Sequence, residues 1–121
     1  MGTAVPTYLD RDFWDYLDRI VAGNPIVIDR PKGSHHPRFP EIIYPVDYGY
    51  LDGTTTVDGG GLDVWVGSIP EKSLSTLVVT VDLHKRDVEI KLLLGCTAVE
   101  EQTILTFHND GMMRAIKITR G

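Results

Sequence analysis

Four aspartates stand in two pairs with the same spacing. Asp58 is followed five residues later by Asp63, and Asp82 is followed five residues later by Asp87. Carboxylate oxygens bind hard cations such as Mg²⁺, usually a few of them together with water and phosphate. The three glycines at 59–61 permit turns that other residues resist, so they could let these carboxylates converge. Because like charges repel, a cluster of the four acids would require a bound cation.

The same residue types also form ordinary turns. Aspartate is frequent in turns because its side chain bonds nearby backbone, and glycine because it adopts unusual dihedral angles. An aspartate taken singly is more often a turn former than a metal ligand, and both interpretations stay open on spacing alone.

Short strands are predicted around these aspartates. Alternating or β-branched residues indicate strands at 26–28, 44–50, 62–66, 77–81, 88–94 and 116–119. The aspartates fall between these segments or at their ends. In the strand 88–94, alternation places Glu89 and Lys91 on one face, opposite the face of Ile90 and Leu92.

A helix is predicted before the strands. Residues 10–22 have apolar side chains at helical spacing, Asp10 is a suitable N-cap, and Gly23 is a suitable stop. The expected buried face consists of Phe13, Tyr16, Leu17, Ile20 and Val21.

A second helix follows the strand 88–94. Thr97 and Glu100 form a capping-box pattern, and the helix is expected to end near 109–111. The segment 30–40 contains three prolines, a glycine and two histidines, so it is predicted to be a loop.

Several strands come in succession rather than alternating with helices. This order favours an α+β protein with an antiparallel sheet or barrel and flanking helices. The length of 121 residues suits one domain.

Composition and charge argue against several classes of partner. The net charge is −5, so neither nucleic acid nor a membrane surface is an expected partner. The single cysteine, Cys96, allows no intrachain disulfide and is expected to be a small buried residue. There is no signal-peptide pattern and no apolar run near the ~20 residues of a membrane span, so a cytoplasmic location is expected.

The segment 44–66 reads YPVDYGYLDGTTTVDGGGLDVWV. It resembles the signature region of family I soluble inorganic pyrophosphatases. In that region a Y-P-x-N-Y-G-[YF] strand leads, through a short link containing threonine, into D-G-D-P-x-D-V. The two segments match in register without a gap.

Weaker similarities extend over most of the chain after Gly23. Asp82 and Asp87 reproduce a second pair of family acids, and residues 26–31 are similar to an early strand ending in I-E-x-P. The resemblance implies an α+β fold, a small OB-like five-stranded antiparallel β-barrel with flanking helices, formed by residues 1–121 as a single domain. It also implies a homo-oligomer and Mg²⁺-dependent hydrolysis of pyrophosphate to two phosphates, with Mn²⁺ as another possible metal.

The resemblance also assigns roles to individual residues. It implies divalent-metal binding by Asp58, Asp63, Asp82 and Asp87, of which Asp63 and Asp87 also serve catalysis. Tyr48 matches a tyrosine that contacts phosphate. Two further phosphate contacts are expected from Arg38 and Lys32, which stand in the loop before the motif.

Among the departures of the chain from the family pattern, two exchange charged residues of this site. Gly60 replaces a carboxylate that helps to activate the attacking water, and Glu89 replaces a lysine. Strand alternation keeps Asp87, Glu89 and Lys91 on one face. We therefore hypothesise that Glu89 restores the lost catalytic carboxylate and that Lys91 restores the lost cation, as a substrate-binding residue.

Three functions are consistent with these residues. The first is an inorganic pyrophosphatase. The second is a hydrolase of another small diphosphate compound, for which the open loop at 32–38 would make room. The third is a phosphate- or metal-binding module without turnover, which the loss of a carboxylate at Gly60 favours.

Overall fold

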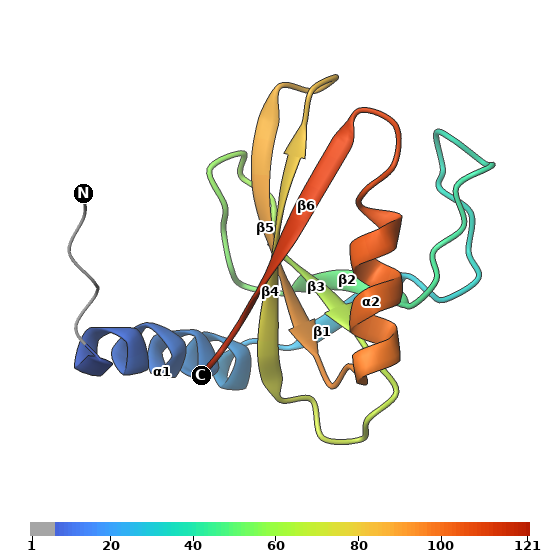
Figure 1. The fold of residues 1–121 in the computed structure, drawn as a ribbon. Helices are drawn as coiled ribbons and strands as arrows, with labels where there is room; N and C mark the ends of the chain where they lie inside the picture. The colour runs from blue at the N-terminus through green and yellow to red at the C-terminus, as the bar shows by residue number, and fades with distance from the viewer. Residues whose placement is uncertain (1–6) are drawn as a thin grey trace.

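The computed structural model of the chain describes residues 7–121, with side chains from Leu9 onward. It contains two helices and six strands (Figure 1). In chain order these are α1 (Thr7–Gly23), β1 (Ile26–Arg30), β2 (Asp47–Leu51), β3 (Leu62–Val66), β4 (Leu74–Asp82), β5 (Asp87–Leu94), α2 (Ala98–Phe107) and β6 (Met113–Thr119). Every predicted helix and strand is present, and 30–40 is largely a loop, as predicted. Among the bounds that differ, the strand predicted at 44–50 begins at Asp47, and α2 ends at Phe107 rather than near 109–111.

The six strands form one mixed sheet. Its order is β1-β2-β3-β5-β4-β6, with β1 and β6 at the two edges of the described sheet. All neighbouring strands are antiparallel except β3 and β5, which pair in parallel through Val64 with Leu92 and Val66 with Leu94.

The α+β class is confirmed, but the described sheet differs from the expected barrel. It has six strands rather than five, it is open, and it is not wholly antiparallel. The reason is the place of β5. Strands β1 to β5 alternate in direction along the chain, so β3 and β5 run the same way, and β5 lies between β3 and β4.

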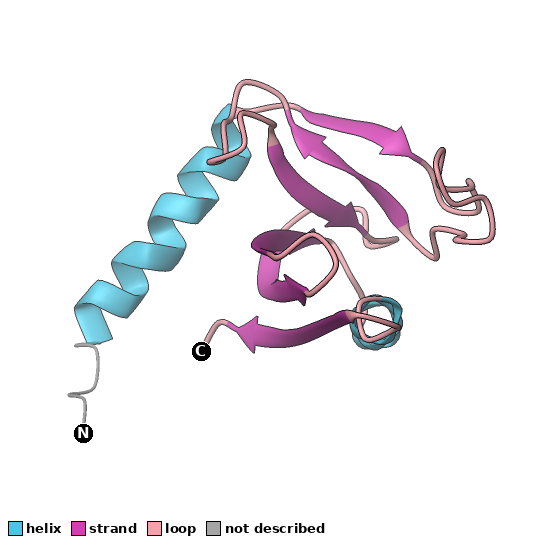
Figure 2. Cartoon of the chain, turned by 90° about the horizontal axis from the view of Figure 1, so that it is seen from above, coloured by secondary structure: helices cyan, strands magenta, loops and turns pink. Residues whose placement is uncertain are grey.

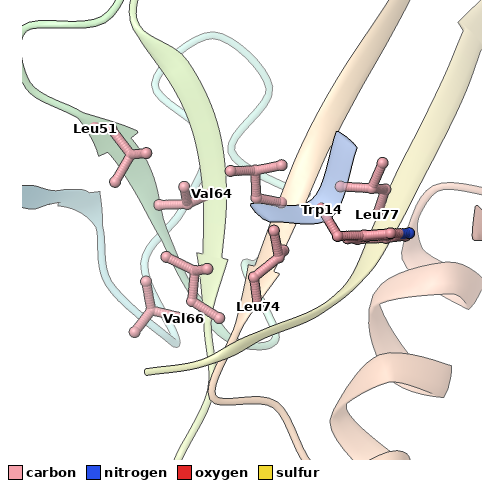
Figure 3. Close-up of a cluster of buried hydrophobic side chains, with 8 residues drawn as sticks. Trp14, Leu51, Val64, Val66, Leu74 and Leu77 are labelled. Carbon is pink, nitrogen blue, oxygen red and sulfur yellow. The ribbon is translucent and has the colours of Figure 1, made fainter. Parts of the chain in front are cut away.

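The sheet carries a core on each face. The helices lie on opposite sides of it, as Figure 2 shows. Strand alternation sends Val64 and Leu92 toward α1 and Trp65 and Leu93 toward α2. The core on the α1 side (Figure 3) contains Trp14, Leu51, Val64, Val66, Leu74, Leu77, Leu92 and Leu94. The core on the α2 side contains Tyr44, Val46, Trp65, Val78, Leu93, Cys96 and Ile104.

The predicted buried face of α1 was wrong in part. Trp14 is 5% exposed and anchors the helix, whereas Phe13, Tyr16 and Ile20 are 51%, 62% and 39% exposed. Leu17 and Val21 pack against the core as expected. The helix is thus rotated toward Trp14, because the large indole packs into the core on this face of the sheet.

The start of α2 is as predicted. Thr97 accepts a hydrogen bond from the Glu100 backbone N–H, and the Glu100 carboxylate accepts one from the Thr97 backbone N–H. This reciprocal pair satisfies backbone groups that a helix N-terminus leaves open. Within residues 7–121, neither helix has the length and apolar character needed to cross a bilayer.

Candidate functional site

Three of the predicted site residues meet in direct contact. The Lys91 ammonium donates hydrogen bonds to the Tyr48 hydroxyl oxygen at 2.8 Å and to Asp63 Oδ2 at 2.9 Å. Glu89 Oε1 lies 3.6 Å from the same nitrogen. We refer to Tyr48, Asp63, Glu89 and Lys91 as the Lys91 cluster.

The sheet order brings this cluster together. Tyr48 of β2 pairs with Trp65 of β3, so these two side chains lie on one face of the sheet. Asp63 precedes Trp65 by two residues in β3, so its side chain lies on that face as well. Because β5 is the other neighbour of β3, Lys91 and Glu89 reach the same face from the opposite side. All of these residues therefore lie on the α2 side of the sheet.

Lys91 is charged although it is buried. Its side chain is only 7% exposed. Burial by itself would lower the pKa of Lys91, but the Tyr48 oxygen and the Asp63 and Glu89 carboxylates outweigh that effect and raise it. A buried ammonium is stable only when partners of this kind compensate the loss of water.

Tyr48 stays protonated at neutral pH. Burial raises its pKa, and the Asp63 carboxylate adds to the increase, while the Lys91 charge opposes it. Its oxygen accepts a hydrogen bond from Lys91, and a side-chain hydrogen bond with Asp63 is a further cause of its raised pKa.

The Tyr48 ring packs against the ring of Trp65, which is held in turn by His108. The ring centroids of Tyr48 and Trp65 are 4.7 Å apart, and Trp65 Nε1 donates to His108 Nε2 at 3.0 Å. Burial, with a smaller effect of Lys91, lowers the pKa of His108 to about 3. His108 is thus neutral and fixes the Trp65 ring as an acceptor, a role that nothing in the sequence indicated.

Asp58 and Asp82 bond to their own turns. Asp58 Oδ1 accepts hydrogen bonds from the Thr56 hydroxyl and from the Gly60 backbone N–H, and these two bonds lower its pKa. Asp82 Oδ1 accepts from the backbone N–H groups of His84 and Lys85 at 2.9 and 3.1 Å. Both carboxylates therefore make the turn hydrogen bonds that the alternative interpretation expects, and metal binding by Asp58 and Asp82 stays a prediction.

Asp87 begins β5, directly opposite Asp82 in the β4–β5 pairing. Strand alternation places it on the same face as Glu89 and Lys91. It therefore lies farther along β5 from the Lys91 cluster, at the hairpin end of the strand.

The carboxylates can be tested as a metal centre from their own contacts. Within residues 7–121, no three His, Cys, Asp or Glu side chains are grouped so that they could hold a metal ion. Asp63 already pairs with Lys91. As they lie, Asp58, Asp63, Asp82 and Asp87 do not fit a metal centre built from protein ligands alone.

The end of β1 and the loop that follows it contribute positive charge beside Tyr44. Arg30 Nη1 donates to the Tyr44 hydroxyl oxygen at 2.7 Å, and His36 stacks near the Tyr44 ring. Burial first, and then the charges of Arg30, Lys85 and Arg38, lower the pKa of His36. Arg30 was not among the predicted site residues, although it stands inside the similar segment 26–31.

The predicted contacts Lys32 and Arg38 both stand in this loop, and their backbone is fixed. The Lys32 backbone N–H donates to Asp47 Oδ1 at 2.7 Å, and the Arg38 backbone N–H donates to His36 Nδ1 at 3.0 Å. The Lys32 contact joins the loop to the first residue of β2, the strand that carries Tyr48.

No protein-family model and no curated protein matches the sequence. Solved structures do match the fold. An inorganic pyrophosphatase from Neisseria gonorrhoeae aligns with 84% of this chain and 85% of its own, at a TM-score of 0.60 and 17% identity. An inorganic pyrophosphatase from Coxiella burnetii aligns with 78% of this chain and 82% of its own, at a TM-score of 0.54 and 14% identity.

A third structure agrees with these two. The inorganic pyrophosphatase of Helicobacter pylori covers 78% of this chain and 81% of its own, at a TM-score of 0.53 and 14% identity. The chain therefore shares the fold of solved inorganic pyrophosphatases, which confirms, at the level of the fold, the resemblance that the segment 44–66 predicted.

Proposed function

We propose that this chain binds and hydrolyses inorganic pyrophosphate at the Lys91 cluster. The observation that carries the proposal is the contact of Tyr48 and Asp63, two residues of the pyrophosphatase-like segment, with Lys91 inside a fold shared with pyrophosphatases. It is supported by the basic loop nearby, which suits a ligand of dense negative charge.

In this proposal the chain's own residues position the anion. Lys32, Arg38 and Lys91 attract phosphate oxygens by charge-assisted hydrogen bonds, and Tyr48 is a further phosphate contact. Asp63, Asp87 and Glu89 are the carboxylates available to orient or deprotonate an attacking water. Phosphoryl transfer depends mainly on such positioning and on electrostatics.

In this proposal the divalent ion binds to the protein together with the substrate. Mg²⁺ is commonly held through substrate phosphates and only one or two protein carboxylates. We therefore take the substrate to be pyrophosphate complexed with Mg²⁺, or with Mn²⁺, rather than pyrophosphate delivered to a metal centre assembled beforehand.

The test is phosphate release from pyrophosphate by the purified chain with Mg²⁺. We expect release by the wild type and a loss of at least about 100-fold in Asp63→Asn and in Asp87→Asn, the lower end of the range for lost acid–base groups. Asp12→Asn is the matched control, because Asp12 is exposed on α1, on the other side of the sheet. No release by the wild type, or full release by both site variants, would refute the proposal.

A second candidate is a diphosphate-binding module without turnover. Gly60 stands where the similar enzymes have a carboxylate, and Asp63 is held by Lys91. Under this candidate, calorimetry would detect pyrophosphate binding while the assay detects no release. A hydrolase for another small diphosphate would instead release phosphate from a panel of nucleoside diphosphate derivatives and not from pyrophosphate.

The wider biological setting also stays a prediction. We propose that residues 1–121 act as a single domain within a homo-oligomer in the cytoplasm, with neither nucleic acid nor a membrane as partner. Sedimentation analysis would measure the size of the assembly.

A further inference from the structure

Lys91 occupies an unusual place for a lysine. Its ammonium lies between two carboxylates, 2.9 Å from Asp63 Oδ2 and 3.6 Å from Glu89 Oε1, with the Tyr48 hydroxyl at 2.8 Å. Oxygen atoms are the usual partners of a buried ammonium and also the ligands of a hard metal ion. Here the cation is covalently part of the chain.

The Lys91 ammonium compensates the negative charges of the cluster. Asp63 and Glu89 carry two negative charges on one sheet face, and their side chains are only 30% and 31% exposed. Like charges that close to each other need a compensating cation. The Lys91 ammonium, which lies 2.9 Å from Asp63 and 3.6 Å from Glu89, supplies it.

A divalent ion would have to compete with this ammonium. An ion bound to Asp63 would share a carboxylate whose Oδ2 already accepts the Lys91 hydrogen bond. The buried ammonium would then lie beside the new ion, and repulsion between the two cations opposes this. Asp63 is thus a poor metal ligand for as long as the Lys91 ammonium lies beside it.

We propose that Lys91 is a built-in cation that takes the place of a divalent metal ion between Asp63 and Glu89, so that the chain without substrate does not bind a divalent ion through Asp63. This role rests on the proposed function for the identity of the site. It adds a binding order, because the divalent ion then arrives with the diphosphate instead of binding first.

The experiment is a calorimetric titration with Mn²⁺ in the absence of pyrophosphate. We expect Lys91→Met to bind Mn²⁺ about tenfold more tightly than the wild type or better, a change of about 1.4 kcal/mol. Combining Lys91→Met with Asp63→Asn should abolish that gain. Equal or weaker binding by Lys91→Met, or a gain that persists in the double variant, would overturn the proposal.

Two further variants control for charge and for folding. Lys117 is the matched lysine: Val78 of β4 pairs with Lys91 on one side and Lys117 on the other, but the Lys117 ammonium lies 3.8 Å from Glu101. Lys117→Met should bind Mn²⁺ like the wild type; a gain equal to that of Lys91→Met would show a nonspecific charge effect and overturn the proposal.

Asp63→Asn alone keeps the test decisive if Lys91→Met does not fold. It should leave Mn²⁺ affinity unchanged, because Lys91 already holds that carboxylate, and a fall in affinity would overturn the proposal. Since no pyrophosphate is present, these outcomes are independent of turnover. If Lys91→Met binds Mn²⁺ more tightly but the wild type releases no phosphate, the proposed hydrolysis is refuted and the proposed role of Lys91 is supported.

Discussion

The hydrogen bond between Trp65 and His108 makes the stability of this protein depend on pH. His108 is 4% exposed, and its Nε2 accepts from Trp65 Nε1, so the folded state needs the neutral imidazole. Burial lowers its pKa from 6.5 to about 3. In the unfolded chain His108 takes up a proton near pH 6.5, whereas in the folded chain it stays neutral until about pH 3.

The size of the effect follows from this difference. Because the unfolded state binds more protons between pH 6.5 and pH 3, the contribution of His108 is complete above pH 6.5 and is lost as the pH falls through that window. One pKa unit corresponds to about 1.4 kcal/mol, so lowering the pH from 7 to 5 should cost about 2 kcal/mol of unfolding free energy.

Urea unfolding at pH 7 and pH 5, followed by circular dichroism, measures this cost. The matched variant is His108→Gln, whose amide oxygen can still accept from Trp65 but does not titrate. Other groups that titrate in this range are common to both proteins. We expect the wild type to lose about 2 kcal/mol more than the variant. An equal loss in the two proteins would show that His108 is not held neutral and would refute the reasoning.

Three further predictions concern the scaffold. Gly49→Ala should destabilise the protein by about 3 kcal/mol or more in urea unfolding, because the added Cβ would lie 1.8 Å from the Val27 carbonyl oxygen. Thr97→Ala should cost about 1 kcal/mol in the same assay, because it removes the side-chain bond to the Glu100 backbone N–H. Cys96 should react very slowly with a disulfide reagent at pH 8 until the chain unfolds; burial, with the nearby charges of Glu100 and Glu101, raises its pKa to about 12. Fast labelling of the folded protein would contradict this last prediction.

The elements themselves were predictable because their signals are local. The strand at Leu62–Val66 was predicted with its observed bounds, and the capping box of Thr97 and Glu100 marked the start of α2. Alternation along β5 correctly assigned Leu92 and Leu93 to opposite faces. Each of these signals depends on a few residues adjacent in sequence, which periodicity and capping chemistry describe well.

The rotation of α1 was not predictable in the same way. Both Phe13 and Trp14 are large and apolar, and either could lead a buried face at helical spacing. Only the shape of the sheet surface decides which ring fits. In the structure Trp14 enters the core and Phe13 stays half exposed.

In the Lys91 cluster, too, some features follow from the sequence and others only from the tertiary structure. The sequence by itself determined that Tyr48 and Asp63 belong to one motif and that Glu89 and Lys91 share a strand face. Only the tertiary structure decided that β5 lies beside β3, which joins Lys91 to Asp63 across 28 residues and to Tyr48 across 43. The physical reason is that alternation fixes the face on which a side chain lies but not the strand that will be its neighbour, because strand order depends on how the whole chain packs.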